Sequence, residues 1–458
     1  MLGLKILKKD FLRKKGVMLI VFLFIMLSAF LMSAGSHLIV ELSTSLNALF
    51  SAARSPHFVQ MHAGDLDRNE VKRWAQRNPL VDEYQLVEMV TMDGSALAFS
   101  GEEENEEHSV MDLGFVTQNE NFDYLLDMEN RPLRLSPGEV AVPVYYLQNR
   151  NVKRGDSLLI EGERSTTRLT VAAFLRDAQM NSSIVHSKRF LLHKSDYTAL
   201  RAHFNEREYL IEFTLTDAER VDAFADAYQA SGLPKKGPSV DYRLFKTLNA
   251  ITDGIVAAVV IVLSLLIMAI ALLCLRFTLI ATLEDDYREI GVMKAIGMRI
   301  GDIQRMYLFK YCALAALAAL LGYLASLPFT RVLSGNILLY LGGAQKTYFQ
   351  HVLPLAGAGF TILIVFVSTA LILRRVKRIS AMEALRGGTV PGNGGKFSCG
   401  GRLLGLEHSR RLNLNVFLGI RDVVQRFRMF ALLGFIFFFS TFIPVDYSVN
   451  NTGQSRKN

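Results

Sequence analysis

Long apolar runs separated by polar stretches dominate the chain. Four runs cover residues 17–34, 254–275, 311–327 and 354–373, and a fifth lies within residues 415–443. A helix of about 20 apolar residues crosses a hydrocarbon core of roughly 30 Å. The pattern therefore predicts a membrane protein with an α-helical transmembrane bundle of about five spans in a lipid bilayer.

The region between the first two runs, residues 37–247, is polar and mixed, and it is long enough to form a domain with its own core. Helical patterns occupy residues 69–78 and 216–231, and the second begins with a Thr-Asp-Ala-Glu capping pattern. Strand-like pieces cover residues 139–144, 157–160, 168–174 and 209–215. We expect a mixed α+β domain between spans 1 and 2.

Two further expectations concern the ends of the spans. Residues 241–253 lead without a strong breaker into the second run, so one helix should begin outside the membrane and continue through it. The third run is rich in alanine, which favours close helix packing, and we expect Pro328 and Arg331 to end it.

Charge predicts the topology. The chain has a formal charge of +8, and its basic residues cluster at 5–15, 276–310 and 374–428, next to the apolar runs. Under the positive-inside rule these clusters, and the N-terminus, are cytoplasmic, which leaves residues 37–247 and 332–353 outside. The same distribution explains the basic composition without nucleic-acid binding.

The first 36 residues combine a basic amphipathic elbow with the first run. A cleaved signal peptide is the competing interpretation, with the small residues at 33–36 as its cleavage region. We favour an uncleaved span, because the run is long for a signal core and a similar arrangement recurs near residue 415.

The loop at residues 285–310 carries apolar residues at helical spacing, interrupted by glycines. Ile290, Met293, Ile296, Ile300 and Ile303 would share one helical face. Because glycines recur along this loop, we expect a short helix, a turn near Gly297 and a second helix. Such a segment between two spans can offer an apolar, positively rimmed surface to a soluble partner, although an ordinary solvated loop fits the periodicity equally well.

Three stretches resemble one family. REIGVMKAIG in this loop, RRVKRISAMEALRGG at residues 374–388 and PGEVAVPVYYLQNRNVKRGDSLLI at residues 137–160 are similar to FtsX-like ABC transporter permeases of the MacB and LolE type. The resemblance implies a bacterial plasma membrane, a MacB-like periplasmic domain, and a coupling helix that docks on a separate ATPase subunit. The docking residues it implies are Arg288, Glu289, Ile290, Gly291, Met293, Lys294, Ala295 and Gly297. A secondary cytoplasmic face would consist of Glu383, Ala384, Leu385 and Arg386.

No stretch supplies a nucleotide site of its own. Gly394-Gly395-Lys396 resembles part of a phosphate-binding loop, but Val390 and Phe397 stand where that loop needs glycine and serine or threonine. The nine histidines and three cysteines show no metal-ligand spacing. We therefore expect no cofactor or catalytic residue in this chain, with ATP bound by the partner subunit.

The predicted organisation has five parts. They are residues 1–36 (elbow and first span), 37–247 (outside domain), 248–386 (FtsX-like core with three spans), 387–414 (glycine-rich cytoplasmic linker) and 415–458 (second elbow, fifth span and polar tail). The second elbow resembles the start of a second half in two-half permeases, so we expect a truncated or split member of that group. An ATPase dimer needs two docking surfaces, which implies a homodimer or a second permease chain.

The leading hypothesis is a permease subunit that couples ATP hydrolysis to export or to mechanotransmission across the membrane. A membrane sensor without transport is the alternative. A membrane-anchored enzyme is a third hypothesis, which no catalytic motif supports.

Overall fold

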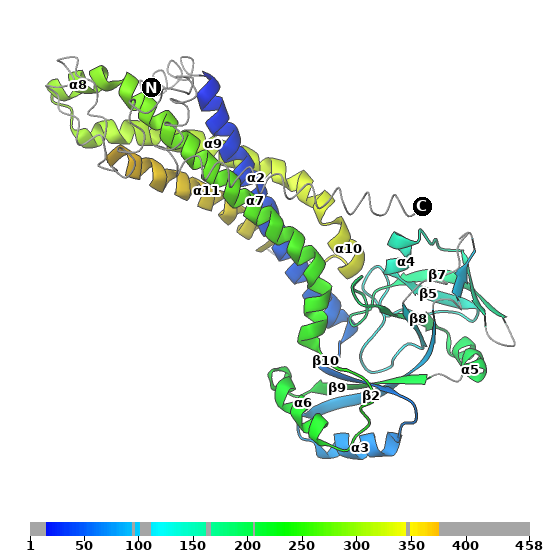
Figure 1. Ribbon diagram of the computed structural model, residues 1–458. Coiled ribbons are helices and arrows are strands. Elements are labelled where there is room, and N and C mark those ends of the chain that lie inside the picture. Colours follow the sequence, from blue (N-terminus) through cyan, green and yellow to red (C-terminus); the bar gives the residue numbers. More distant parts are fainter. Residues whose placement is uncertain are drawn as a thin grey trace, which may run out of the picture. The chain divides into compact units, whose positions relative to one another are not determined.

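A computed structural model describes residues 15–374 apart from 94–96, 101–110, 162–165, 205–206 and 345–348 (Figure 1). The predicted secondary face at Glu383, Ala384, Leu385 and Arg386, the linker, and the fifth span lie outside the described residues, as does nearly all of the N-terminal elbow. The chain divides into two compact units. The first comprises Met1–Phe24, Leu266–Ala315 and Leu363–Asn458, and the second comprises Ile25–Leu265 and Ala316–Ile362.

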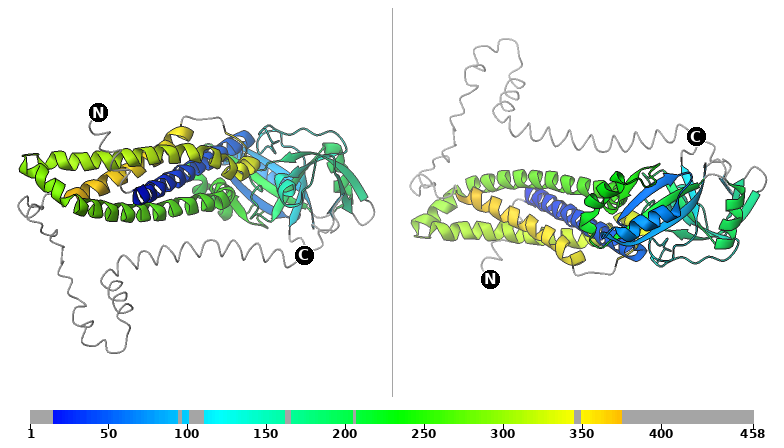
Figure 2. Two further views of the ribbon diagram at one scale, coloured as in Figure 1. Left: turned by 90° about the horizontal axis from the view of Figure 1, so that it is seen from above. Right: turned by 90° about the horizontal axis from the view of Figure 1, so that it is seen from below.

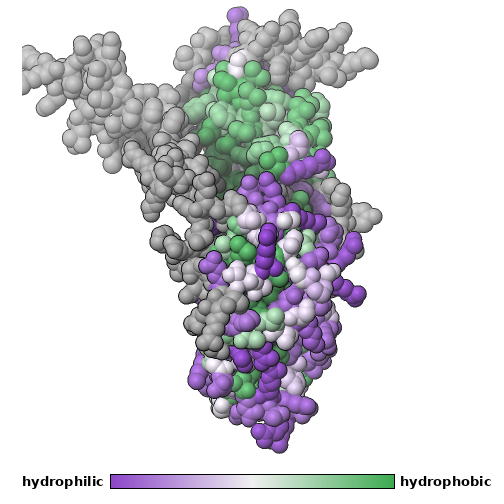
Figure 3. Space-filling view, turned by 90° about the vertical axis from the view of Figure 1, so that its right-hand side faces the viewer, coloured by the Kyte–Doolittle hydropathy of each residue, from purple (hydrophilic) through white to green (hydrophobic). Residues whose placement is uncertain are grey.

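The long helices are α2 (Lys15–Ala53), α7 (Tyr242–Asp285), α9 (Ile300–Leu333) and α11 (Phe349–Leu373), with the short α8 (Tyr287–Ala295) and α10 (Gly335–Leu341) between them. Among the described residues, four helical stretches are long and apolar enough to cross a membrane: Gly16–Ala53, Tyr242–Asp285, Ile300–Leu333 and Val352–Leu373. They run side by side in both views of Figure 2. The face shown in Figure 3 is hydrophobic over the helices and mainly hydrophilic over the sheet domain. These features are those of a multi-pass membrane protein.

The expected end of the third span at Pro328 is wrong, because α9 continues through Pro328 to Leu333. A proline inside a helix leaves a backbone carbonyl without its usual donor. Neighbouring hydroxyl groups bond to carbonyls in this turn: Ser326 Oγ donates to Tyr323 O (2.7 Å) and Thr330 Oγ1 donates to Leu327 O (3.0 Å). These bonds lie on carbonyls near that of Leu324, the group that lacks the Pro328 donor, and the helix continues through the proline.

Helices α2 and α7 both extend beyond the apolar runs. The predicted continuous helix across residues 241–275 is confirmed by α7, which is 44 residues long. Helix α2 continues to Ala53, because residues 37–53 hold no breaker and place Leu38, Leu42 and Leu49 on a buried face.

Glycines allow α2 to approach its neighbours closely. A Cβ on Gly322 of α9 would overlap the carbonyl oxygen of Met26, and one on Gly35 would lie 2.6 Å from the Ile261 side chain of α7. A Cβ on Gly357 of α11 would lie 3.2 Å from the Met32 side chain. The hydrophobic effect does not drive helices together in lipid. Small residues at such crossings allow close van der Waals packing, which holds the helices together instead.

The sheet domain lies between α2 and α7 in the sequence and contains one ten-stranded sheet with the order β10-β1-β9-β2-β4-β8-β5-β7-β6-β3. Pairs β4–β8 and β5–β7 are parallel and the others are antiparallel. The strands are β1 (Phe58–Ala63), β2 (Val81–Asp93), β3 (Leu97–Phe99), β4 (Asp112–Val116), β5 (Glu139–Pro143), β6 (Ser157–Glu161), β7 (Thr166–Leu175), β8 (Ser187–Leu192), β9 (Arg207–Leu215) and β10 (Ser239–Asp241). The helices are α3 (Arg68–Arg77), α4 (Val144–Asn149), α5 (Lys194–His203) and α6 (Val221–Ala230), with a 3-10 turn at Ala218–Arg220.

The predicted mixed α+β character is confirmed, and the four expected strands correspond to β5, β6, β7 and β9. Helices α3 and α6 lie against one face of the sheet (Figure 1). The single tryptophan, Trp74 of α3, packs there against the rings of Phe213, Phe224 and Tyr228 at centroid distances of 5.5–5.9 Å. Strands β1 and β10, which adjoin α2 and α7, pair with each other at one edge of the sheet.

Candidate functional site

The loop between α7 and α9 folds as predicted, into a short helix, a turn at Gly297 and a second helix. Helix α8 ends in a Schellman motif: the Met298 N–H donates to Met293 O (3.0 Å) and the Gly297 N–H donates to Lys294 O (3.1 Å). The backbone of Gly297 has a φ of 95°, in the left-handed region that glycine adopts without steric cost.

Side chains from the neighbouring helices hold this loop. Tyr307 of α9 donates its hydroxyl hydrogen bond to Asp286 Oδ2 at 2.7 Å, which ties the first turns of α9 to the start of α8. Gln304 Nε2 donates to Leu373 O, near the end of α11, at 2.8 Å. The loop is therefore a braced element, so a force applied to it acts on α9 and α11.

The eight docking residues implied by the resemblance differ in exposure. Arg288, Glu289, Ala295 and Gly297 are exposed, while Met293 and Lys294 are half-buried. Ile290 and Gly291 are buried in the first unit. These two residues can shape the loop, but they offer little surface to a partner.

The expected single apolar face is split by the turn. Ile290 and Ile303 are fully buried, whereas Ile296, just before Gly297, is 78% exposed. Val292 and Met298, which are 42% and 41% exposed, were not predicted from helical spacing. We call the exposed set of Arg288, Glu289, Val292, Ile296 and Met298 the loop surface.

A second constellation lies where the sheet domain meets the helices of the second unit. Each of the last four carbonyls of α10 accepts a hydrogen bond from a sheet-domain side chain, and that of Leu338 also accepts one from the Gly342 N–H. Arg176 donates to Leu338 O (2.7 Å) and Leu339 O (2.9 Å), Asn181 donates to Tyr340 O (2.6 Å), and Asn130 donates to Leu341 O (3.3 Å). A guanidinium at this position also complements the negative end of the helix dipole.

The same segment contacts the first turns of α7. Asn249 Nδ2 donates to Ala178 O at 3.0 Å, and Ser182 Oγ donates to Leu248 O at 2.8 Å. Residues 176–182 therefore connect the sheet domain to two helices; we call them the junction segment.

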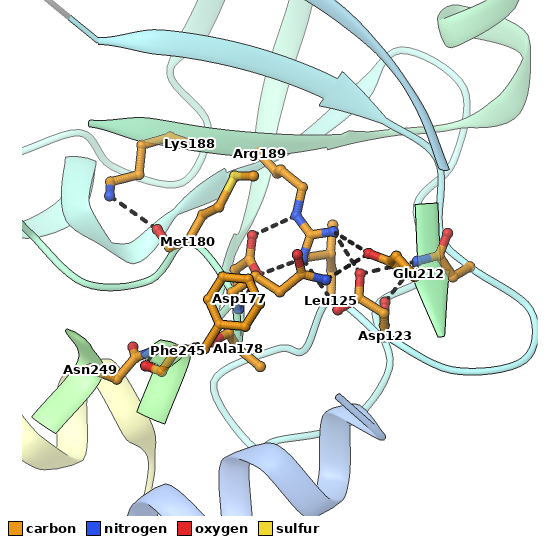
Figure 4. Close-up of polar contacts among 12 residues, drawn as sticks. Asp123, Leu125, Asp177, Ala178, Met180, Lys188, Arg189, Glu212, Phe245 and Asn249 are labelled. Atoms are coloured by element: carbon orange, nitrogen blue, oxygen red, sulfur yellow. Dashed lines mark hydrogen bonds and ion pairs between the residues drawn. The ribbon is translucent and has the colours of Figure 1, made fainter. Parts of the chain in front are cut away.

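A buried ionic cluster lies on the other side of the junction segment (Figure 4). Arg189 of β8 donates to both carboxylate oxygens of Asp177 (2.5 and 2.7 Å) and to Asp123 Oδ2 (2.6 Å). Glu212 of β9 lies farther away, with Oε1 3.9 Å from Arg189 Nη1. All four side chains are at most 3% exposed.

The cluster perturbs its own ionisation. Burial would lower the pKa of Arg189, but Asp123 and Asp177 outweigh it and hold that pKa well above its usual value. Burial would raise the pKa of Asp177, but the charge and hydrogen bonds of Arg189 bring it below the usual value. For Glu212 burial prevails and, with the Asp123 charge, keeps the pKa well above the usual value.

The neighbouring Lys188 is also buried. Its ammonium group donates to the carbonyls of Met180 (3.0 Å), Ser182 (2.7 Å) and Val185 (2.6 Å), and thereby organises the end of the junction segment. Burial lowers the pKa of Lys188 to about 8, opposed by the charge of Asp177. This cluster was not predicted from the sequence. The available signal was the Lys188-Arg189 pair directly before three apolar residues of a strand, since buried charges require partners.

Comparison with known proteins agrees with the sequence motifs. No curated protein matches the chain. Among solved structures, the periplasmic region of MacB from Actinobacillus actinomycetemcomitans is similar over 43% of this chain and 94% of that chain, with 7% identity and a TM-score of 0.25, a likeness too weak to assign roles to residues. Residues 261–381, which include the loop between α7 and α9, match the family described as FtsX-like permease C-terminal. The match over residues 261–381 supports the resemblance of this part of the chain to FtsX-like permeases.

Proposed function

We propose that this chain is the permease subunit of an ABC transporter and that a separate ATPase subunit docks on the loop surface. The observation that carries the proposal is the exposure of Ile296 at the tip of a braced turn, within the FtsX-like domain. Apolar side chains flanked by Arg288 and Glu289 form the kind of small apolar patch with a charged rim that protein partners recognise.

Coupling would proceed through the helices that brace the loop. ATP binds to the partner, not to this chain, and closure of the partner moves α8. Tyr307 and Gln304 pass this displacement to α9 and α11, while the continuous helix α7 carries it toward the sheet domain. The energy comes from the different affinities of the ATPase for two conformations of the permease. The output is export or mechanotransmission.

The proposed topology follows from charge. Basic residues around α8 support a cytoplasmic loop surface in a bacterial cell, with the sheet domain outside the plasma membrane and the N-terminus inside. We retain Glu383, Ala384, Leu385 and Arg386 as a secondary part of the docking face.

The test is co-purification of the full chain with its candidate ATPase in detergent. Ile296→Asp places a charge in the middle of the loop surface and should abolish both ATPase capture and permease-dependent ATP turnover. The control is Ile184→Asp, because Ile184 is also an exposed isoleucine (50%) but belongs to the sheet domain. Equal capture by both variants would refute docking at this surface. Capture by the wild type with ATP turnover unaffected by the permease would favour the sensor function.

We also propose that two permease chains pair along α7. Seven residues of this helix recur at alternating spacings of four and three, the period of a coiled-coil seam: Leu244, Leu248, Ile251, Ile255, Ala258, Val262 and Leu265. Leu244 and Ile251 are 45% and 39% exposed, although they lie among charged residues before the apolar run begins. In the proposed topology this part of the helix lies outside the lipid, so a second chain is the natural partner.

Cysteine crosslinking tests the pairing. In a chain without its three native cysteines, Ile251→Cys should form a disulfide-linked dimer in membranes. Thr252→Cys, also exposed and adjacent but off the seam, should not. Equal crosslinking at both positions, or at neither, would contradict a seam along α7.

A further inference from the structure

The ionic cluster holds one carboxyl group more than its cations can balance. Arg189 forms ion pairs with Asp123 and Asp177, and Lys188 interacts electrostatically with Asp177. Two cations thus offset two aspartates, and Glu212 remains. A buried carboxylate without a cation is strongly disfavoured and tends to take up a proton.

The nearest neighbours of Glu212 are neutral. Its two oxygens lie 2.6 Å from Gln85 Nε2 and 2.6 Å from Gln179 Nε2. The buried Oε1 of Gln179 accepts no hydrogen bond from any of the described residues. A half-turn of this amide would bring Oε1 to Glu212, where it would accept a hydrogen bond from a protonated carboxyl group.

The surroundings of Glu212 offer little else to hold its charge. Across the strand pairs, β1 contributes Val59 and β2 contributes Gln85. The charged groups that face Glu212 are Asp123 from the segment after β4, Asp177 from the junction segment, and Arg189 from β8. Asp123 disfavours ionisation of Glu212, and both aspartates bind the one cation that would favour it.

The junction segment links this carboxyl group to the helices. Within it, Asp177 and Gln179 face the ionic cluster, whereas Arg176, the Ala178 carbonyl and Asn181 contact α10 or α7. Residues bound to the cluster and residues bound to the helices are thus direct neighbours in the chain.

We propose that Glu212 is a proton-binding site and that the junction segment relays its ionisation to α7 and α10. With the proton bound, the cluster is electrically balanced and the segment is held in place. When the proton leaves to solvent, the new carboxylate competes for Arg189 and draws it away from Asp177. The junction segment then loses its main contact with the cluster, and its bonds to α7 and α10 weaken. This inference does not depend on the identity of the ATPase or the substrate.

Infrared difference spectroscopy on the full chain in nanodiscs tests the proton site directly. The wild type should show the carbonyl band of a buried protonated carboxyl group at mildly acidic pH, and Glu212→Gln should lack it. Asp123→Asn removes a neighbouring negative charge and frees part of Arg189, so it should lower the midpoint of this band by about one pH unit or more. The exposed Glu161→Gln serves as the control and should leave the band unchanged.

Hydrogen–deuterium exchange tests the relay. Exchange is measured at about pH 5 and about pH 8, on either side of neutrality, in the wild type and in Glu212→Gln. The exchange rate of the wild type divided by that of Glu212→Gln, in residues 176–182 and 242–250, should be greater at the higher pH, because only the wild type can lose the proton. The ratio of wild type to Glu161→Gln should stay constant. A band that persists in Glu212→Gln would overturn the proton site. A lost band together with identical exchange in the wild type and Glu212→Gln would overturn the relay.

Discussion

Ser28 and Ser264 exchange reciprocal hydrogen bonds between α2 and α7. Ser28 Oγ donates to Ser264 O at 3.2 Å, and Ser264 Oγ donates to Ser28 O at 3.0 Å. Both serines are fully buried, so the two helices are held at one level by a symmetric pair of contacts in an otherwise apolar region.

Replacing either serine with alanine should lower the stability of the helical bundle by about 0.6 kcal/mol, a typical value for a polar contact between membrane helices. The double variant should lose about twice as much, because each hydroxyl donates to a backbone carbonyl that the other substitution leaves in place. Thermal unfolding of the full chain in detergent, followed by circular dichroism, measures the effect, with exposed Ser183→Ala as the control. A double variant no weaker than one single variant would show that the two bonds are not independent.

Gly322→Ala should separate α2 from α9, since the added methyl group would overlap Met26 O. We expect a loss of about 1–3 kcal/mol, the usual cost of overpacking. Gly359→Ala in α11 meets nothing within 4 Å and should be neutral or stabilising, because alanine favours a helix over glycine. The ratio of folded to unfolded protein after graded detergent denaturation compares the two. Equal losses would mean that the close crossing contributes nothing.

Gly297→Ala should weaken ATPase capture without unfolding the chain. The added side chain strains the left-handed turn, at a cost of about 1 kcal/mol, and shifts Ile296 and Met298 relative to each other. Gly301→Ala, at a glycine with open space around it and no positive φ, is the matched control. Capture in a pull-down should fall only for Gly297→Ala; a fall for Gly301→Ala alone would indicate that the first turn of α9, and not the turn at Gly297, forms the docking element.

Arg189→Met should destabilise the sheet domain by about 3–5 kcal/mol, because it leaves buried carboxylates without their cation. Arg201→Met, which removes a half-exposed partner of Glu88, should cost about 1 kcal/mol or less. Fluorescence of Trp74 reports on this domain alone, since it is the only tryptophan and lies in the α3–α6 core. Similar unfolding midpoints for the two variants would contradict the importance of the cluster.

His57 should make the domain less stable in acid. Burial lowers the pKa of His57, with Asp82 opposing and Lys246 adding to the effect, and its Nδ1 accepts the Leu215 N–H bond at 2.8 Å. Below the usual value of 6.5 the unfolded chain binds a proton that the folded chain excludes, so stability falls as the pH falls through this value. Denaturant titrations read by Trp74 should show this slope reduced in His57→Asn and retained in exposed His203→Asn.

Elements with a simple periodic pattern were predictable from the sequence. Helix α7 follows from an unbroken apolar continuation, and the turn at Gly297 follows from a glycine placed between two amphipathic pieces. Strand β8 was missed because its first residues, Ser187, Lys188 and Arg189, look solvent-exposed when the partners that neutralise them are unknown. The effect of Pro328 was predicted wrongly because proline ends most helices, whereas α9 continues through it to Leu333.

The loop surface shows the same limit at the level of the site. Helical spacing placed Ile290 and Ile296 on one face, but the path of the chain after Gly297 buries the first and exposes the second. The direction of α9 decides whether Ile290 or Ile296 is exposed to a partner. Contacts such as that of Tyr307 with Asp286 set this direction.

The junction segment has a consequence for how this protein can vary. From Arg176 to Gln179, successive residues contact the helices and the ionic cluster in turn. Deleting one residue here would turn residues that contact the helices toward the ionic cluster, and residues that contact the cluster toward the helices. A register slip of a strand has the same effect on its two faces. Related proteins should therefore tolerate substitutions in this segment far more readily than a change in its length.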